Sequence, residues 1–290
     1  MPRIAIIGPG AVGGVMAAWL AKDGRHEVSL CCRTPVESLT VETPEGVLSS
    51  RPAVFTDPKA APAVDWVLVT TKTYDAASAA LWFPNLTAQG APVAVLQNGV
   101  EHRERFASYL PADRLIPVIV DCPAERFGPG RILQRRVAKL LVPAEGRGPE
   151  FVELFAGTAI EAALTDDFRT AAWRKLCVNS AGVINALLLK PSGVMRDDGV
   201  AEVARQLVRE CIAVGRAEGA VLGDELVESV IQGYRQGPPE SVNSIQADRA
   251  AGRPMETDAR NGVIVRLGLR HRIPTPCNHM AAVLLGAMAK

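Results

Sequence analysis

Between Trp173 and Asn185 the sequence reads WRKLCVNSAGVIN, which places a lysine and two asparagines in a segment that otherwise has the composition of a buried helix. Lys175 and Asn179 are four residues apart, so they share one face of a helix. Burying an unpartnered ammonium is costly and asparagine is a mediocre helix former, so we expect this face to border a polar cleft. A lysine there could protonate a carbonyl oxygen while a nicotinamide delivers hydride. The residues alone leave a second interpretation open, in which Lys175 reaches solvent and Asn179 makes a helix-packing hydrogen bond.

A glycine-rich segment near the start of the chain predicts the cofactor site that this chemistry needs. The pattern G-x-G-x-x-G lies between the strand-like run RIAIIG and the helix-like run AVGGVMAAWLAK, and a second strand-like run, HEVSLCCR, completes a βαβ unit. One glycine suits a tight turn, one the close approach of a pyrophosphate, and one helix packing. This context favours dinucleotide binding over glycines that only shape a turn. The predicted cofactor loop consists of Gly8, Pro9, Gly10, Ala11, Val12 and Gly13.

Polar residues also follow three later strand-like segments. Arg33 ends the second strand, where a guanidinium could pair with a 2′-phosphate, and no acidic residue adjoins it in the sequence, so NADP is favoured over NAD. Lys72 follows WVLVTT and Asn98 follows PVAVL. Because ligands bind outside the carboxyl ends of strands in open α/β sheets, we expect these side chains to share a crevice with the glycine loop. The alternatives are a solvated Arg33, a helix-start Lys72 and a turn-forming Asn98.

The order of elements predicts two domains. Strand-like and helix-like segments alternate at first, which is typical of an α/β fold with a parallel sheet covered on both faces, and further strands are expected at 65–71, 91–97 and 114–120. Helical stretches are expected between these three strands. Long helix-like segments follow at 166–188, 200–219, 223–236 and 259–272. We therefore predict a Rossmann-type dinucleotide-binding domain over residues 1–164 and an all-helical, substrate-binding domain over 165–290.

Composition excludes several other classes of function. The 290 residues include 32 Lys and Arg against 31 Asp and Glu, and this balance gives no reason to expect nucleic acid or an anionic membrane as a partner. The six cysteines form no CxxC pair and no histidine stands at metal-ligand spacing, so no metal site is expected and a reducing cytoplasm fits best. The first apolar run is too short for a signal peptide or a membrane span. Chemistry on a small molecule is therefore the class of function that the composition favours.

Five segments together resemble the ketopantoate reductase family: GPGAVGG, TTKTYD, LQNGV, WRKLCVNS and NSIQADRAAGRPMETDARNG. The resemblance runs in order through both predicted domains and covers essentially the whole chain. It implies an oxidoreductase whose Rossmann domain binds NADPH and whose helical domain takes a 2-oxo acid. The implied reaction reduces 2-dehydropantoate to (R)-pantoate for pantothenate and coenzyme A synthesis. The resemblance leaves a homodimer open.

The same resemblance assigns roles to individual residues. Lys175 matches the catalytic lysine, a general acid towards the ketone oxygen, and Glu256 matches a carboxylate near the lysine and the cofactor. Taken without the resemblance, Ser244 could be a helix N-cap and Glu256 a first-turn carboxylate of the next helix. The expected substrate-binding set is Asn98, Asn179, Asn185 and Ser244. The expected cofactor-binding set is the glycine loop with Arg33, Lys72, Asn98 and Glu256.

One departure from the family pattern concerns the asparagines. The family has a second asparagine one helical turn after the first, but position 183 here is Val183. Asn185 lies six residues after Asn179 and would point away from the Lys175 face unless the helix bends near Gly182.

A second departure is Ser192, which stands where the family commonly has an asparagine. The pocket could therefore suit a different branched 2-oxo or 2-hydroxy acid, or an imino acid, with an unchanged reaction type. A non-catalytic NADP-binding sensor is a further alternative, but such a protein would not need a matched lysine, amide and carboxylate.

Overall fold

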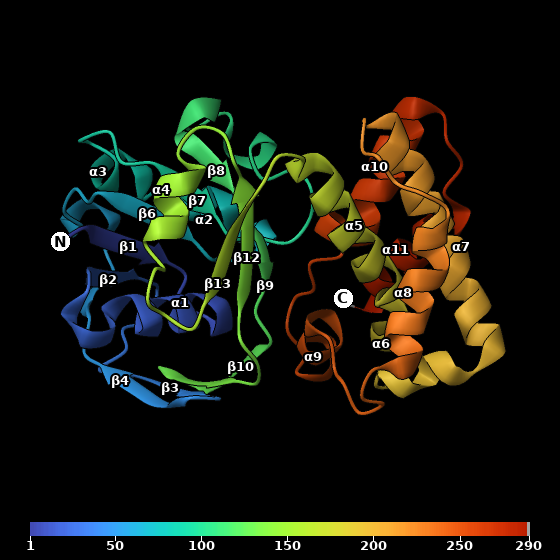
Figure 1. Cartoon of the computed structure of the whole chain (residues 1–290), viewed down its shortest axis with the longest axis horizontal. Coiled ribbons are helices and arrows are strands. Elements are labelled where there is room, and N and C mark those ends of the chain that lie inside the picture. The colour runs from blue at the N-terminus through green and yellow to red at the C-terminus, as the bar shows by residue number, and fades with distance from the viewer. Residues whose placement is uncertain (289–290) are drawn as a thin grey trace. The chain divides into compact units, whose positions relative to one another are not determined.

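The computed structural model describes residues 1–288, and the chain divides into two compact units, Met1–Phe168 and the part from Arg169 onward (Figure 1). The division falls close to the predicted boundary at residue 164. Within residues 1–288, no helix combines the length and apolar composition needed to span a bilayer. Over the same residues, His, Cys, Asp and Glu side chains do not gather in threes as a metal site would require.

The first unit is built on a parallel sheet, as predicted, and this sheet has six strands, including β5, which the sequence patterns did not indicate. Its strand order is β5-β2-β1-β6-β7-β8, and every neighbouring pair is parallel. Ile4 and Ile6 of β1 pack in the core that contains helix α1, whereas Ala5 and Ile7 pack with α2 and α3. Both faces of the sheet are therefore covered, which explains the nearly continuous apolar strand sequences. The elements are β1 (Arg3–Ile7), α1 (Ala11–Ala21), β2 (Glu27–Cys31), β5 (Ala53–Phe55), β6 (Trp66–Val69), α2 (Ala76–Ala80), α3 (Phe83–Leu86), β7 (Val93–Val95) and β8 (Leu115–Pro117).

Helix α1 has a second cover that the sequence patterns did not predict. A four-stranded sheet of order β10-β11-β3-β4 packs on it, so that α1 is buried almost all round (Figure 1). Trp19 of α1 donates its indole N–H to Gln134 Oε1 at 2.9 Å, and a side chain at Gly14 would overlap Ile132. These strands are β3 (Leu39–Thr43), β4 (Gly46–Ser50), β10 (Ala124–Gly128) and β11 (Arg131–Gln134).

The end of the parallel sheet also differs from prediction. The single strand expected at 114–120 is two strands in different sheets, β8 and β9 (Ile119–Asp121), because the chain leaves the parallel sheet after Pro117. β9 joins a small sheet with β12 (Lys139–Pro143) and β13 (Glu161–Thr165), and α4 (Gly148–Glu153) packs on the latter two strands. The helical stretch expected between β7 and β8 consists of two short 3₁₀ turns.

The second unit is helical throughout its described residues, as predicted. The expected helix over 166–188 is broken at Gly182, where a side chain would crowd the Tyr234 hydroxyl at 2.7 Å and Asn243 Nδ2 at 2.9 Å. The α-helices are α5 (Phe168–Ala181), α6 (Val183–Leu188), α7 (Asp198–Ala217), α8 (Glu225–Gln236), α9 (Ser244–Ala250), α10 (Val263–His271) and α11 (Pro276–Met288). A 3₁₀ segment, η6 (Ser192–Arg196), precedes α7, and a π-helical turn, η7 (Asp258–Gly262), leads into α10.

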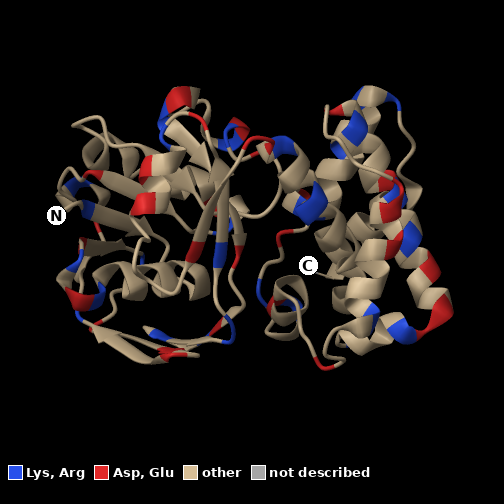
Figure 2. Cartoon of the chain, viewed as in Figure 1, with Lys and Arg blue, Asp and Glu red and all other residues tan. Residues whose placement is uncertain are grey.

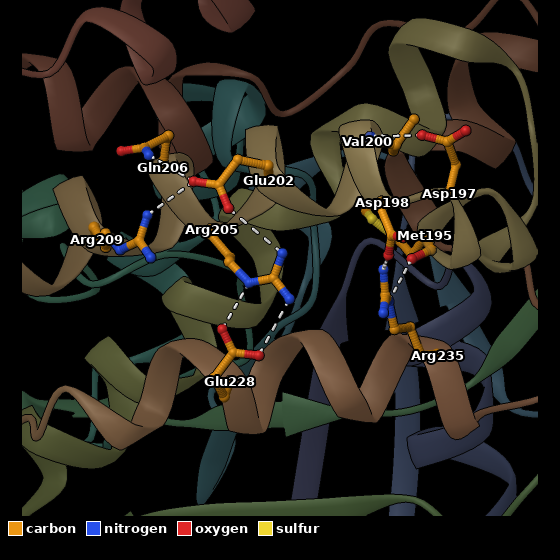
Figure 3. A network of polar contacts seen from close by, with 10 residues as sticks. All are labelled: Met195, Asp197, Asp198, Val200, Glu202, Arg205, Gln206, Arg209, Glu228 and Arg235. Atoms are coloured by element: carbon orange, nitrogen blue, oxygen red, sulfur yellow. Dashed lines mark hydrogen bonds and ion pairs between the residues drawn. The ribbon is translucent and has the colours of Figure 1, made fainter.

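Ion pairs hold α8 against α7. Arg205 of α7 donates from Nε to Glu228 Oε1 at 2.6 Å, and Arg235 of α8 donates to Asp198 at the start of α7 (Figure 3). Asp197 caps α7 by accepting a hydrogen bond from the Val200 amide. Positively and negatively charged residues are interspersed along these helices (Figure 2). These ion pairs hold α8 in place, and other residues of α8 line the pocket described below.

Candidate active site

The glycine loop has the geometry of an anion-binding turn. Gly8 has a positive φ of 81°, a backbone conformation that residues with side chains rarely adopt. Its amide donates to Cys31 O at 3.0 Å, which ties the loop to the end of β2. Helix α1 then starts at Ala11 with Gly10 as N-cap and no side-chain cap. The first amides of α1 therefore point out of the helix start, where the helix dipole favours a phosphate.

The glycines of this loop have different steric surroundings. A side chain at Gly13 would overlap Thr70 Oγ1 and lie 2.8 Å from Gly8 O, so only glycine lets the helix approach β6 this closely. A side chain at Gly10 would have only one neighbour within 4 Å, Gly8 O at 3.9 Å. Gly13 is therefore required for packing, whereas space beside Gly10 remains for a ligand.

Side-chain hydrogen bonds join the carboxyl ends of the central strands. Thr70, after β6, donates to Ile7 O at 3.0 Å and to Gly8 O at 2.8 Å. Gln97, after β7, donates to Thr71 O at 3.0 Å. Because β2, β1, β6 and β7 are consecutive in the sheet, the four predicted strand ends meet at one edge.

Lys72 and Asn98 lie in the two loops joined by Gln97. Lys72 is half-buried and precedes a 3₁₀ turn, Thr73–Asp75, whose last amide donates to Lys72 O at 3.0 Å. Asn98 is also half-buried, and its carbonyl accepts a hydrogen bond from Arg105 Nη1 at 3.2 Å. The backbone at both positions is thus fixed by hydrogen bonds within the unit.

His102 supports the Asn98 loop, and the sequence patterns gave no indication of this. Its Nε2 lies 2.9 Å from Gln97 O, and since a carbonyl can only accept, Nε2 carries the proton. Burial disfavours the imidazolium and the nearby Arg105 charge repels it, so the pKa of His102 falls to about 4. The ring is therefore neutral at pH 7 and serves as a fixed donor.

The surroundings of Arg33 correct one expectation. Its side chain is 83% exposed at the end of β2, but its Nη2 donates to Asp75 Oδ2 at 3.2 Å. An acidic group therefore does stand beside Arg33, although it is distant in the sequence and follows β6. The bond to Asp75 uses one of the five guanidinium donors, which leaves Arg33 able to contact a phosphate.

In the second unit, Lys175 lies on the wall of a pocket of about 580 Å³. Its lining includes Lys175 and Val178 of α5, Val230 and Tyr234 of α8, and Ser192, whose hydroxyl donates to Ser241 O at 3.0 Å. The pocket thus combines a cation with an apolar wall. Such a site can hold the aliphatic body of an organic acid while the ammonium meets one of its oxygens.

Asn179 lies one helical turn from Lys175 but is only 7% exposed. Its Oδ1 accepts a hydrogen bond from Nη2 of Arg260, in η7, at 2.8 Å. The face predicted to border a polar cleft therefore has two parts: Lys175 borders the pocket, and Asn179 lies against a buried guanidinium. Arg260 is a polar residue of this region that the sequence patterns did not single out.

Asn185 does not lie where a substrate-binding residue is expected. Its side chain is 0% exposed, its Nδ2 donates to Lys190 O at 3.0 Å, and its Oδ1 accepts from Asn243 Nδ2 at 3.2 Å. The helix does break at Gly182, as the expectation required, but the amide turns into the protein. We therefore assign Asn185 to the support of Asn243 and no longer to substrate binding.

Ser244 is not a helix N-cap and Glu256 is not in the first turn of a helix, although the sequence allowed both interpretations. Asn243, not Ser244, is the N-cap of α9, because its side chain accepts from the Gln246 amide at 3.0 Å. Ser244 is the exposed first residue of that helix. Glu256 is buried and precedes η7 by two residues, so it is not in the first turn of a helix. Its charge opposes the loss of the Arg260 proton, although burial is the larger effect and lowers the pKa of Arg260.

Comparison with known proteins identifies the family. A family model described as Ketopantoate reductase PanE/ApbA matches residues 4–144, and its C-terminal counterpart matches residues 167–289. The chain belongs to the ketopantoate reductase family. Membership confirms the predicted family, the Rossmann-type fold class and the oxidoreductase activity, and NADPH is the cofactor that this family uses.

Individual ketopantoate reductases agree with this assignment along the whole chain. A 2-dehydropantoate 2-reductase of Caulobacter vibrioides is 56% identical over 289 residues, with all of both chains covered. A 2-dehydropantoate 2-reductase of Mycobacterium tuberculosis is 38% identical, with 98% of this chain and 97% of the relative covered. The crystal structure of a PanE/ApbA family ketopantoate reductase from Ralstonia eutropha superposes with a TM-score of 0.90 at 32% identity, covering 99% and 98% of the chains.

A dehydrogenase with another substrate shares the fold. The structure of D-mandelate dehydrogenase with NADH and anilino(oxo)acetate superposes with a TM-score of 0.91 at 18% identity, covering 99% of this chain and 98% of that one. At that identity the similarity concerns the fold alone.

Proposed function

We propose that this protein is a 2-dehydropantoate 2-reductase, which uses NADPH to reduce 2-dehydropantoate to (R)-pantoate. The observation that carries the proposal is the 56% identity, over the full length of both chains, to a 2-dehydropantoate 2-reductase. The uncapped start of α1 behind Gly8 and the position of Lys175 on a pocket wall support the same chemistry.

The first unit carries the proposed cofactor contacts. The loop from Gly8 to Gly13 and the amides at the start of α1 receive the pyrophosphate. Arg33 pairs with the 2′-phosphate, and Lys72 and Asn98 contact the cofactor from the loops after β6 and β7. NADPH supplies the hydride when bound. The hydrogen bonds among Thr70, Gln97 and the strand ends hold these groups in place before the cofactor binds.

The second unit carries the proposed acid and most of the substrate contacts. When hydride adds to the carbonyl carbon, the π electron pair of the C=O bond moves to oxygen, which takes a proton from the Lys175 ammonium. The positive charge of Lys175 also stabilises the oxygen while negative charge develops on it. Solvent then returns a proton to the amine. Asn179 and Ser244 orient the substrate by hydrogen bonds, and Glu256 orients the ammonium.

A second candidate is reduction of a different branched 2-oxo acid by the same steps. It is favoured by Ser192, which lines the pocket with Lys175 at a position where the family commonly has a longer amide. A shorter side chain leaves room for a different substituent on the acid.

Steady-state NADPH oxidation with a panel of 2-oxo acids distinguishes the two candidates. The panel contains ketopantoate, 2-oxoisovalerate, which lacks the hydroxymethyl group, and phenylglyoxylate, which is aromatic. We expect ketopantoate to have the highest kcat/KM by at least about tenfold, because a site that hydrogen-bonds a hydroxyl discriminates against an analogue lacking it. A higher kcat/KM for another acid would favour the second candidate, and no NADPH oxidation with any acid would contradict both.

Arg33 and Asp75 provide a test of cofactor choice. We expect NADPH to bind more tightly than NADH, and Arg33→Ala to reduce that preference at least about tenfold by removing a charge-assisted contact to the 2′-phosphate. Asp75→Asn should increase the preference severalfold, because it removes a negative charge beside Arg33. Fluorescence titration of both cofactors measures these ratios, and equal affinities in the unmodified protein would contradict the assignment of Arg33.

We also propose that the protein acts in the cytoplasm. All six cysteines are free thiols, including Cys177 and Cys211, whose sulfur atoms lie only 3.5 Å apart. Thiols this close stay reduced most readily where glutathione and thioredoxin systems operate.

A homodimer is the oligomeric state that we propose. Val283 and Leu284 of α11 follow Met280 by three and four residues, so the three lie on one side of the helix. All three are exposed, so α11 presents an apolar patch to its surroundings. Sedimentation velocity should show a dimer that Val283→Glu converts to a monomer. A monomeric unmodified protein would contradict the proposal.

A further inference from the structure

A buried arginine contacts the helix that carries the proposed acid. The Arg260 side chain belongs to η7 and the residue is only 3% exposed. Its Nη2 donates to Asn179 Oδ1 at 2.8 Å, whereas its Nε and Nη1 are buried without a hydrogen-bond partner among residues 1–288. Burying a guanidinium in this way is unfavourable, so a purely structural role would be better filled by an apolar side chain of similar volume.

The π-helical turn fixes the position of Arg260 independently of its guanidinium. Ala259, Arg260 and Asn261 are consecutive and all buried, which a regular surface α-helix does not allow. Asn261 Nδ2 donates to Ser180 O at 3.2 Å and to Asn278 Oδ1 at 2.9 Å. Two consecutive residues of η7 thus contact two consecutive residues of α5: Arg260 contacts Asn179, and Asn261 contacts Ser180. The Asn261 network anchors η7, and Arg260 uses that anchor to reach Asn179.

The chemistry of arginine determines which way the Asn179 amide points. A guanidinium has donors and no acceptor, so the atom that faces Arg260 must be the amide oxygen. The NH₂ group of Asn179 is therefore directed away from Arg260, and it has no hydrogen-bond partner among the described residues. Asn179 is one helical turn from Lys175, so its buried NH₂ group lies on the same face of α5 as the proposed acid.

We propose that Arg260 is a positioning residue: it locks the Asn179 amide in the orientation that donates a hydrogen bond to an oxygen of the oxo acid. The proposal rests on the function proposed above. Without Arg260 the amide could rotate and present its oxygen, which would repel a carboxylate or carbonyl oxygen of the substrate.

A double-mutant cycle on the oxo acid KM tests this role. Arg260→Met keeps the length and apolar volume of the side chain and removes its donors. We expect it to raise KM about tenfold, the value of one lost hydrogen bond, and to change kcat less than about threefold, because Lys175 is untouched. Asn179→Ala should raise KM similarly. The double variant should be no worse than Asn179→Ala within about twofold, because both changes remove the same interaction. Arg260→Lys, which still only donates, should restore part of the loss.

Two further variants separate orientation from folding. Arg266→Met removes an exposed arginine that donates to Asp258, the first residue of η7, and should leave KM unchanged. Asn179→Asp keeps an acceptor for Arg260, so the fold should survive, but it cannot donate, and KM should rise at least about tenfold. This variant keeps the proposal testable if Arg260→Met fails to fold in a thermal melt.

The outcomes distinguish this inference from the proposed function. If none of the 2-oxo acids tested supports NADPH oxidation by the unmodified protein, the proposed function fails and the role of Arg260 fails with it. If the unmodified protein is active, three results overturn the role of Arg260 alone: an unchanged KM for Arg260→Met, multiplicative effects in the double variant, or an unchanged KM for Asn179→Asp.

Discussion

Replacing Lys175 with methionine should lower kcat for the best oxo acid at least about a hundredfold, the lower range for a positioned general acid. Methionine keeps most of the aliphatic stem that lines the pocket but cannot supply a proton or a positive charge. NADPH affinity should stay within about threefold, because the glycine loop, Arg33 and Lys72 all belong to the other unit. Single-turnover kinetics with NADPH, together with cofactor titration, measures the two effects separately.

Lys190→Met is the matched control for this experiment. Lys190 is an exposed lysine after α6 in the same unit, and its hydrogen bonds to Asn185 are made by its backbone: the carbonyl accepts from Asn185 Nδ2 and the N–H donates to Asn185 O. Its replacement should leave kcat unchanged. A Lys175→Met protein that reduces oxo acid at close to the unmodified rate would show that another group, or water, protonates the oxygen.

Positions close in sequence or fixed by strand ends were predictable. The apolar runs indicate the central strands, and the rule that ligands bind beyond parallel strand ends predicts that Lys72 and Asn98 lie near the glycine loop. The sheet over α1 was missed because its strands are short and partly exposed. One of its pairings, β11 with β3, joins Arg131 to Thr40, and no local pattern indicates that contact.

Side-chain partners that are distant in sequence were not predictable. Asp75 reaches Arg33 across 42 positions and Arg260 reaches Asn179 across 81, so each pair depends on how whole elements pack. The sequence does not indicate the π-helical form of η7 either. A regular helix would turn either Arg260 or its neighbours outward. Asn185 failed as a site residue for the same reason: its orientation depends on Asn243, 58 positions later.

Alanine substitutions at two glycines of the cofactor loop should lower stability by different amounts. Gly13→Ala should lower the free energy of unfolding by about 2 kcal/mol, because its methyl group would displace the Thr70 hydroxyl and disturb two hydrogen bonds to the end of β1. Gly10→Ala should lower it by less than about 1 kcal/mol, because no neighbour lies closer than 3.9 Å and the loss is only that of a preferred N-cap residue. Urea denaturation without cofactor measures both changes.

Cofactor titration should show that Gly10→Ala, the variant with the smaller loss of stability, still binds NADPH much more weakly than the unmodified protein. In Gly10→Ala the added methyl group occupies the space where the pyrophosphate would approach the start of α1, so that at least one charge-assisted hydrogen bond from a backbone amide is lost. A loss of about 2 kcal/mol raises the Kd of NADPH about thirtyfold in a protein whose fold is intact. Gly13→Ala should also weaken NADPH binding, but only together with its loss of stability. If Gly10→Ala bound NADPH as tightly as the unmodified protein, the pyrophosphate could not lie against Gly10, and the open space beside this residue would need another explanation.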